Sequence, residues 1–225
     1  IQVPVQSNID FGIGPNDGFR ITTNVQPVIP VGINEDWNVI SRTIVPIIYQ
    51  DDITGPRSSQ FGLGDVLQSV FFSPKAVGDN GVIWGAVPAV LLRTGTESGL
   101  SAEKWGIGPT GVLLKQDGPW TYGILANQIW SFAGNDQRSD ISQAFIQPFL
   151  TYINQDQVTF AANSETTYNW IDDQATLPIN FNISKLYPGK QPFQLGFGAR
   201  YYVERPENGP EWGLRIQFTL LFPAG

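Results

Sequence analysis

The chain has no cysteine, no histidine and no methionine among its 225 residues. Without cysteine and histidine it cannot build thiolate or imidazole metal sites, and it lacks the general base of the Ser-His-Asp and Cys-His hydrolases. The net charge of −7 provides no basic stripe for a nucleic acid. We therefore expect a non-enzyme with no catalytic residue, no cofactor, no metal site and no nucleic-acid partner.

Long apolar runs are also absent. The chain contains no stretch of about 18 apolar residues, which is the length that a transmembrane helix needs. Charged side chains make up only 15% of the chain, compared with about 25% in ordinary soluble domains. Aromatic residues, in contrast, reach 12%. This composition fits either a large soluble β-sandwich or a β-barrel whose outside faces lipid and whose inside faces water.

Alternation of apolar and polar residues predicts strands throughout. The even positions from Trp212 to Phe222 are all apolar, while Arg215, Gln217 and Thr219 lie between them. A period of two places such residues on one face of a strand and on no single face of a helix. With Gly-, Pro-, Asn- and Asp-rich turns between the segments, the pattern predicts about twelve strands near residues 3–13, 19–33, 37–50, 61–74, 82–94, 105–116, 120–133, 141–153, 157–170, 175–187, 192–204 and 212–222.

Strand length favours the membrane barrel over the sandwich. The expected strands run eleven to fifteen residues, whereas globular strands cluster at about five or six and membrane-crossing strands need about nine to eleven. Sheet in lipid must close on itself, because no unpaired edge can lie there. We predict one all-β domain over residues 1–225, a closed antiparallel transmembrane β-barrel with both termini on the periplasmic side. The absent initial methionine indicates a mature outer-membrane chain after signal-peptide removal.

Tryptophan supplies an independent indication. All seven lie near expected strand ends, where amphipathic rings meet lipid headgroups, and not at strand centres as in a sandwich core. Three belong to the periplasmic side of this scheme and four to the outer side. The expected aromatic girdle consists of Trp37, Trp84, Trp105, Trp120, Trp130, Trp170 and Trp212.

Six prolines fall inside expected strands, although proline has no N–H for the hydrogen-bond ladder and normally sits at edges or bulges. Bulges or local ladder breaks are therefore expected at similar heights around the wall. These residues are Pro27, Pro46, Pro88, Pro109, Pro148 and Pro178.

Several motifs resemble one family along nearly the whole chain. They cover FGIGPND at 11–17, the segment 34–46, FGLGD at 61–65, KWGIGP at 104–109, GPWTYG at 118–123, WSFAG at 130–134 and the ending 209–223. The chain is similar to bacterial outer-membrane transporters of the MetA-pathway-of-phenol-degradation type, also labelled neuromedin U. That resemblance implies an outer-membrane location and transport, and it brings no defined substrate and no catalytic residues.

If the apolar register faces lipid, the opposite register lines the lumen. Every strand arginine falls on this less apolar face, and a guanidinium in mid-membrane lipid would cost about 2–4 kcal/mol. The margin is thin for Arg42 and Arg93, because both registers of their strands carry several aliphatics. The expected lumen-lining charges are Asp10, Arg20, Arg42, Arg93, Glu165, Arg200, Glu204 and Arg215.

Two roles for these charges stay open. They could line a water-filled path, as in a channel or facilitated transporter for small solutes, including apolar or aromatic ones. They could instead pair across a side-chain-plugged interior, giving a sealed structural or adhesive barrel. Since no long loop is expected to fold inward, side chains would have to form such a plug. The expected partners are the bilayer and a small solute, with homo-oligomerisation left open, and an outer-membrane enzyme is the third and weakest reading.

Overall fold

The computed structural model describes residues 1–76 and 81–222, and the regular structure in these ranges is entirely β-strand. No helix in this part of the chain is long and apolar enough to cross a membrane. The strands are β1 (Gln2–Ile13), β2 (Gly18–Val25), β3 (Val28–Gly32), β4 (Trp37–Asp51), β5 (Ser59–Leu63), β6 (Val66–Pro74), β7 (Val82–Leu92), β8 (Lys104–Asp117), β9 (Trp120–Gly134), β10 (Ser142–Ile153), β11 (Val158–Ser164), β12 (Thr166–Asn169), β13 (Gln174–Tyr187), β14 (Phe193–Glu204) and β15 (Trp212–Leu221).

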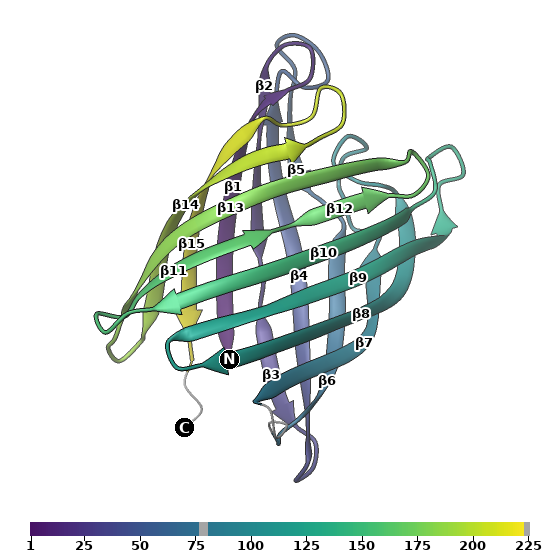
Figure 1. The fold of residues 1–225 in the computed structure, drawn as a ribbon. Helices are drawn as coiled ribbons and strands as arrows, with labels where there is room; N and C mark the ends of the chain where they lie inside the picture. Colours follow the sequence, from purple (N-terminus) through teal and green to yellow (C-terminus); the bar gives the residue numbers. More distant parts are fainter. Residues whose placement is uncertain (77–80, 223–225) are drawn as a thin grey trace.

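All of these strands belong to one antiparallel sheet that closes into a barrel (Figure 1). Sequence neighbours pair around the wall, and β15 returns to pair with β1 from Gln2↔Leu221 to Phe11↔Trp212. The pairs β2/β3, β5/β6 and β11/β12 are each two halves of one barrel strand, so the wall has twelve strands. The predicted fold class, a closed antiparallel transmembrane barrel of about twelve strands, is confirmed.

Three of the prolines mark the places where a barrel strand divides in two. Pro27 itself separates β2 from β3. Pro46 of β4 lies opposite the gap between β5 and β6, where it accepts a hydrogen bond from Gly64 N (2.9 Å). Pro178 of β13 lies opposite the gap between β11 and β12, where its carbonyl accepts from Ser164 Oγ (2.8 Å). Because proline cannot donate to the neighbouring strand, the ladder is interrupted there.

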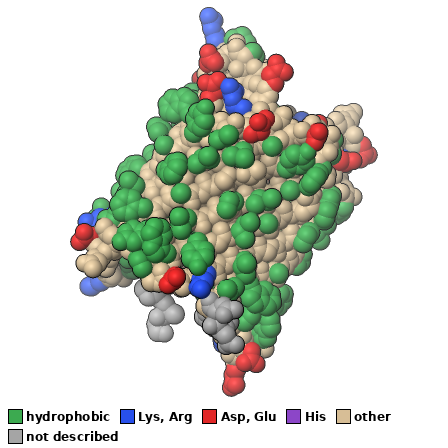
Figure 2. Space-filling model, viewed as in Figure 1, with side chains coloured by type: hydrophobic (Ala, Val, Ile, Leu, Met, Phe, Trp, Pro, Cys, Tyr) green, Lys and Arg blue, Asp and Glu red, His purple; other side chains and the backbone are tan. Residues whose placement is uncertain are grey.

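On the face of the barrel in Figure 2, hydrophobic side chains are spread over the wall, and the charged side chains gather towards its ends. On β13 and β14 the outward residues Phe181 and Phe197 are 63% and 59% exposed, while inward Arg200 is only 8% exposed. A belt of exposed aliphatic and aromatic side chains of this extent is the surface that a barrel presents to hydrocarbon.

The two ends of the barrel differ in their connections. Ile1 and Phe222, the first and last described residues, lie at one end of the barrel, where Phe222 N donates to Ile1 O (2.7 Å), and we call this end the terminal rim (Figure 1). The opposite end, the loop rim, carries the connections 14–17, 52–58, 93–103, 135–141, 170–173 and 205–211. The segment 93–103 is the longest connection in the described ranges. Longer connections at one rim are typical of the extracellular side, and the periplasmic position of the termini stays a prediction.

The tryptophans lie at the ends of strands. Trp37, Trp84 and Trp120 lie near the terminal rim, where Trp37 and Trp84 pack edge to face with centroids 6.1 Å apart. The other four lie near the loop rim, and each is well exposed: Trp105, Trp130, Trp170 and Trp212. Stacking of Trp212 on Phe11 (4.6 Å) joins the last strand to the first at this level.

The outward register predicts a depth-dependent penalty for charge. Ile216 lies at the middle of β15 and is 41% exposed, so Ile216→Arg should lower the free energy of unfolding by about 2–4 kcal/mol. Leu220, on the same face of the same strand but near the rim, provides the matched control, and Leu220→Arg should cost about 1 kcal/mol or less. Denaturant titration of the protein in lipid vesicles measures both, and equal costs would contradict the assignment of the lipid face.

Candidate functional site

The strand pairing defines which side chains point into the barrel. Across β15, β1 and β2, the inward set contains the cross-strand pairs Arg215↔Asn8 and Asp10↔Arg20. The outward set contains the adjacent pairs Leu214↔Ile9 and Ile9↔Ile21. The inward register around this part of the wall is polar.

A cluster of arginines and carboxylates lies inside the barrel towards the loop rim. Glu165 Oε2 accepts from Arg215 Nη2 at 2.7 Å and from Arg200 Nη2 at 3.5 Å. Arg200 Nη1 also lies 3.5 Å from Asp10 Oδ2, and Arg215 Nε donates to Asn8 Oδ1 at 2.7 Å. Arg200 and Arg215 are 8% and 2% exposed. We call Asp10, Glu165, Arg200 and Arg215 the arginine–carboxylate cluster.

Local backbone features make room for this cluster. Glu165 occupies the single-residue gap between β11 and β12, opposite Pro178, so the ladder break brings its carboxylate into the interior. Gly213 lies beside Asp10 and Arg200 in the ladder. A Cβ atom at Gly213 would come within 2.5 Å of Asp10 Oδ1, so no larger residue fits without moving the carboxylate.

Two further luminal arginines have no carboxylate within 4 Å in the part of the chain that the structure describes. Arg20 Nε donates to Gln50 Oε1 (2.9 Å) on β4, and Arg42 Nη2 donates to Gln26 Oε1 (2.9 Å) beside the β2/β3 gap. Amide oxygens are neutral, so these contacts orient the guanidinium groups without cancelling their charge.

The opposite part of the lumen is apolar. A chamber of about 430 Å³ lies inside the barrel between β4, β6, β7, β9 and β10. Its walls carry aliphatic and aromatic side chains from the inward register, together with Arg42, Asp65, Asn127 and Gln143. The apolar lining residues are Ile44, Leu67, Leu91, Leu100, Ala102, Ile129, Ile141 and Phe145.

The segment 93–103 folds into the barrel mouth, which corrects the expectation that no loop does so. Leu100 is 8% exposed and lines the chamber. Asp65, in the β5/β6 gap, anchors the segment by accepting from Gly95 N (3.0 Å) and Ala102 N (2.7 Å), and from Ser101 Oγ (2.8 Å). From outside, Arg138 Nη2 donates to Ser101 O at 2.6 Å. The mouth is therefore narrowed by a loop that side-chain hydrogen bonds hold in place.

Another ion pair holds the loop-rim end of β8. Buried Lys104 Nζ lies 3.0 Å from Asp140 Oδ1 in the connection 135–141. The hydrogen bonds from Lys104 and Ser131 keep the pKa of Asp140 below its usual value. Charge pairing at this position connects two adjacent loop-rim segments.

The expected lumen-lining residues fall into two groups. Six lie in the interior: Asp10, Arg20, Arg42, Glu165, Arg200 and Arg215. The other two lie at the loop rim. Arg93 follows the end of β7, is 43% exposed and lies 3.9 Å from Glu103, while Glu204 ends β14 and is exposed.

Sequence reasoning missed the polar residues that support the arginines and the apolar chamber. Gln50 and Asn8, which accept from Arg20 and Arg215, are buried in the inward register, and their positions in the alternation were the available signal. The chamber residues gave a weaker signal, since the strands that carry them have aliphatic side chains in both registers.

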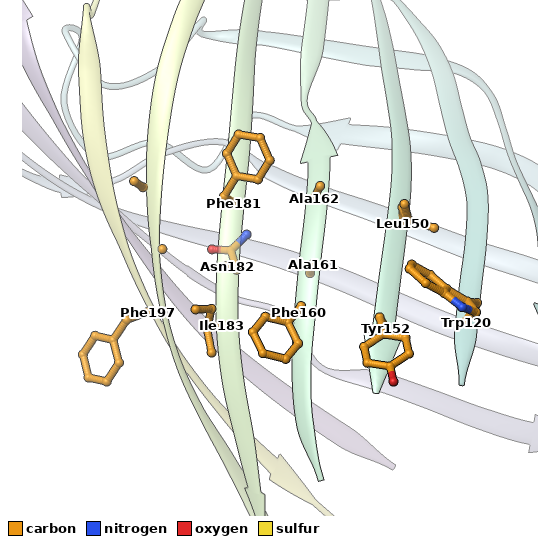
Figure 3. Close-up of a pocket in the computed structure, with 12 residues that line it drawn as sticks. Trp120, Leu150, Tyr152, Phe160, Ala161, Ala162, Phe181, Asn182, Ile183 and Phe197 are labelled. Atoms are coloured by element: carbon orange, nitrogen blue, oxygen red, sulfur yellow. The ribbon is translucent and has the colours of Figure 1, made fainter. Parts of the chain in front are cut away.

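A groove of about 760 Å³ lies on the lipid-facing wall and not in the lumen (Figure 3). Outward aromatic residues of β9 to β14, including Trp120, Phe160, Phe181 and Phe197, flank small residues such as Ala162. Its position on the belt makes it a surface for acyl chains, because this face lies in hydrocarbon.

Comparison with known proteins identifies the architecture. No family model matches the chain, and no curated protein matches it. The COG4313 outer membrane channel from Pseudomonas putida F1 has a similar structure, with a TM-score of 0.73, 15% identity, and coverage of 98% of this chain and 94% of that chain. The NanC porin has a TM-score of 0.56 and 14% identity, and the match covers 99% of this chain and 100% of that chain. Outer membrane phospholipase A from Escherichia coli has a TM-score of 0.57 and 11% identity, and the match covers 97% of this chain and 92% of that chain.

Likeness at these identities establishes the fold alone, which is that of outer-membrane β-barrels. These neighbours include channels and an enzyme, so the fold does not choose between those classes. The resemblance to the phenol-degradation family is not confirmed and stays a prediction.

Removal of Arg215 and removal of Arg205 should lower the free energy of unfolding by different amounts, although the two arginines form ion pairs of the same length. Arg215–Glu165 and Arg205–Glu211 are both 2.7 Å long, but Arg215 is 2% exposed while the second pair lies in a loop with side chains 34% and 57% exposed. Arg215→Ala leaves the largely buried carboxylate of Glu165 with Arg200 as its one ion-pair partner among the described residues, and it should lower the free energy of unfolding by about 3–5 kcal/mol. Arg205→Ala should cost about 1 kcal/mol or less. Urea titration in vesicles tests the pair, and a small cost for Arg215→Ala would show that the cluster is not structural.

Proposed function

We propose that the chain is an outer-membrane channel or facilitated transporter that passes small solutes through a narrow, partly polar lumen. The observation that carries this proposal is the chamber of about 430 Å³ inside a closed barrel, since side chains and the inward loop do not fill the interior. Eight-stranded barrels are filled by their side chains, whereas barrels of sixteen or more strands hold open channels. A twelve-stranded wall lies between these limits and supports a narrow path.

The charged side chains in the lumen favour the passage of anions over that of cations. Arg20, Arg42, Arg200 and Arg215 face the interior with Asp10, Asp65 and Glu165. Asp65 accepts hydrogen bonds from segment 93–103. In the arginine–carboxylate cluster, Asp10 pairs with Arg200 and Glu165 pairs with Arg215. The charges of Arg20 and Arg42 are therefore the least compensated. Basic rings in pores select for anions by the same electrostatic attraction.

A sealed scaffold is the alternative that this proposal must exclude. Planar-bilayer recording of the purified protein should show small ionic currents with a greater permeability to chloride than to potassium. Arg20→Gln removes one luminal positive charge that has no carboxylate within 4 Å among the described residues, and it should lower this preference by about a factor of two or more. A complete absence of ion and small-solute flux would favour the scaffold, and cation preference would contradict the electrostatic account.

The inward loop predicts a second change in conduction. Asp65→Ala removes the hydrogen bonds that hold residues 95–102 in the mouth, so the loop should loosen and single-channel conductance should rise, with added noise. Asp52→Ala provides the control, because Asp52 caps Arg57 N within a different loop. Unchanged conductance in Asp65→Ala, with the protein fully folded, would show that segment 93–103 does not limit the path.

A further inference from the structure

We infer that the luminal chamber binds a small amphipathic carboxylate, with the anionic group on Arg42 and the apolar body among the chamber side chains. This inference rests on the proposed function for its route of entry and names the substrate class of the same lumen. It depends on two neighbouring features that no ordinary packing requirement explains: a guanidinium with no carboxylate within 4 Å among the described residues, and an apolar cavity that this guanidinium lines.

The chamber has the size and composition of a small-molecule site. Its volume of about 430 Å³ falls in the range of about 300–1,000 Å³ that is usual for ligand pockets. Such pockets are mostly apolar, with a few polar groups that fix orientation. Here Asn127 and Gln143 stand among the aliphatic walls, and Phe145 and Ile129 give a surface suited to a ring or a branched chain.

Arg42 supplies the anion-binding group. It lies near the middle of β4, and its only hydrogen bond to a described residue uses Nη2, which donates to Gln26. The remaining N–H groups of the guanidinium are available to a ligand. A planar guanidinium matches a carboxylate with two parallel hydrogen bonds, which are among the strongest polar contacts in proteins.

The nearby acidic groups do not compete for Arg42. Asp65 also lines the chamber, but its two oxygens accept from the backbone of Thr94, Gly95 and Ala102 and from the Ser101 hydroxyl. Glu165 makes its direct ion pairs with Arg200 and Arg215 and acts on Arg42 only by longer-range attraction across the lumen. The arrangement therefore leaves one positive charge at the edge of an apolar space.

These features together define the ligand class. A neutral hydrocarbon would fill the chamber but would desolvate Arg42 without a counter-charge. A small inorganic anion would satisfy Arg42 but leave the apolar walls uncovered. A monocarboxylate with a compact aromatic or branched apolar body meets both requirements, because each part contacts a surface of its own kind.

Equilibrium dialysis against protein in lipid nanodiscs tests the site without requiring conduction. The probe is radiolabelled 3-phenylpropanoate, and empty nanodiscs give the background from lipid partitioning. Saturable binding should exceed this background, while 3-phenylpropanamide, which lacks the charge, should bind about tenfold more weakly or worse. Propanoate, which lacks the ring, should also bind about tenfold more weakly. Equal binding of the acid and the amide would overturn the inference without any variant.

Substitutions then assign the site. Arg42→Gln should weaken 3-phenylpropanoate binding about tenfold, whereas Arg57→Gln, in an exposed loop, should stay within about twofold because solvent screens it. Phe145→Ala should weaken binding of the aromatic acid and leave propanoate unchanged. Heat-modified migration in detergent gels checks folding of each variant. Full affinity in folded Arg42→Gln would overturn the assignment.

Binding and conduction have separate outcomes. Specific binding with no ion flux would support the site and refute the open channel. Ion flux with no saturable binding would support the channel and refute the site.

Discussion

The structure depends on one constraint: a sheet in hydrocarbon must pair its backbone groups, so the wall must close. Pairing of β15 with β1 meets this requirement and makes the first and last segments of the chain neighbours. Closure also separates the side chains into two populations, because alternate residues of each strand face opposite solvents. The apolar belt and the polar interior are two results of the same backbone pairing.

The prolines show how the wall accommodates irregularity without leaving an edge. Where Pro46 and Pro178 cannot donate, the neighbouring barrel strand divides, and an acidic residue occupies each gap. Asp65 in one gap anchors the mouth loop, and Glu165 in the other binds two arginines. The interruptions of the ladder thus place two of the carboxylates of the interior.

Much of the wall could be predicted from sequence because its signal is local. Period-two alternation in β13, β14 and β15 gave both their span and their lipid-facing side, and the ends of strands gave the positions of the tryptophans. The lumen was harder to predict, since cross-barrel contacts such as Arg215–Glu165 join residues far apart in sequence. Segment 93–103 carries no alternation, and its inward path depends on Asp65 and on Gly62, where Thr96 and Leu100 pack.

The weak alternation of β4, β6 and β7, whose inward residues line the chamber, now has a physical explanation. Their inward residues include Ile44 and Leu67, which line the apolar chamber, so both faces of these strands are apolar for different reasons. One face contacts lipid and the other contacts the chamber. An interior that is charged on one side and apolar on the other distinguishes this lumen from a uniformly polar pore and is the basis of the proposed preference for amphipathic anions.

The central claim is that outward residues face lipid and inward residues face the barrel interior. Because the chain has no native cysteine, single cysteines at positions 214 to 219 of β15 can each carry a nitroxide label in vesicles. Spin-label accessibility should alternate with a period of two: labels at 214, 216 and 218 should collide with lipid-soluble oxygen, and labels at 215, 217 and 219 should not. A profile with no alternation, or with the opposite phase, would contradict the account.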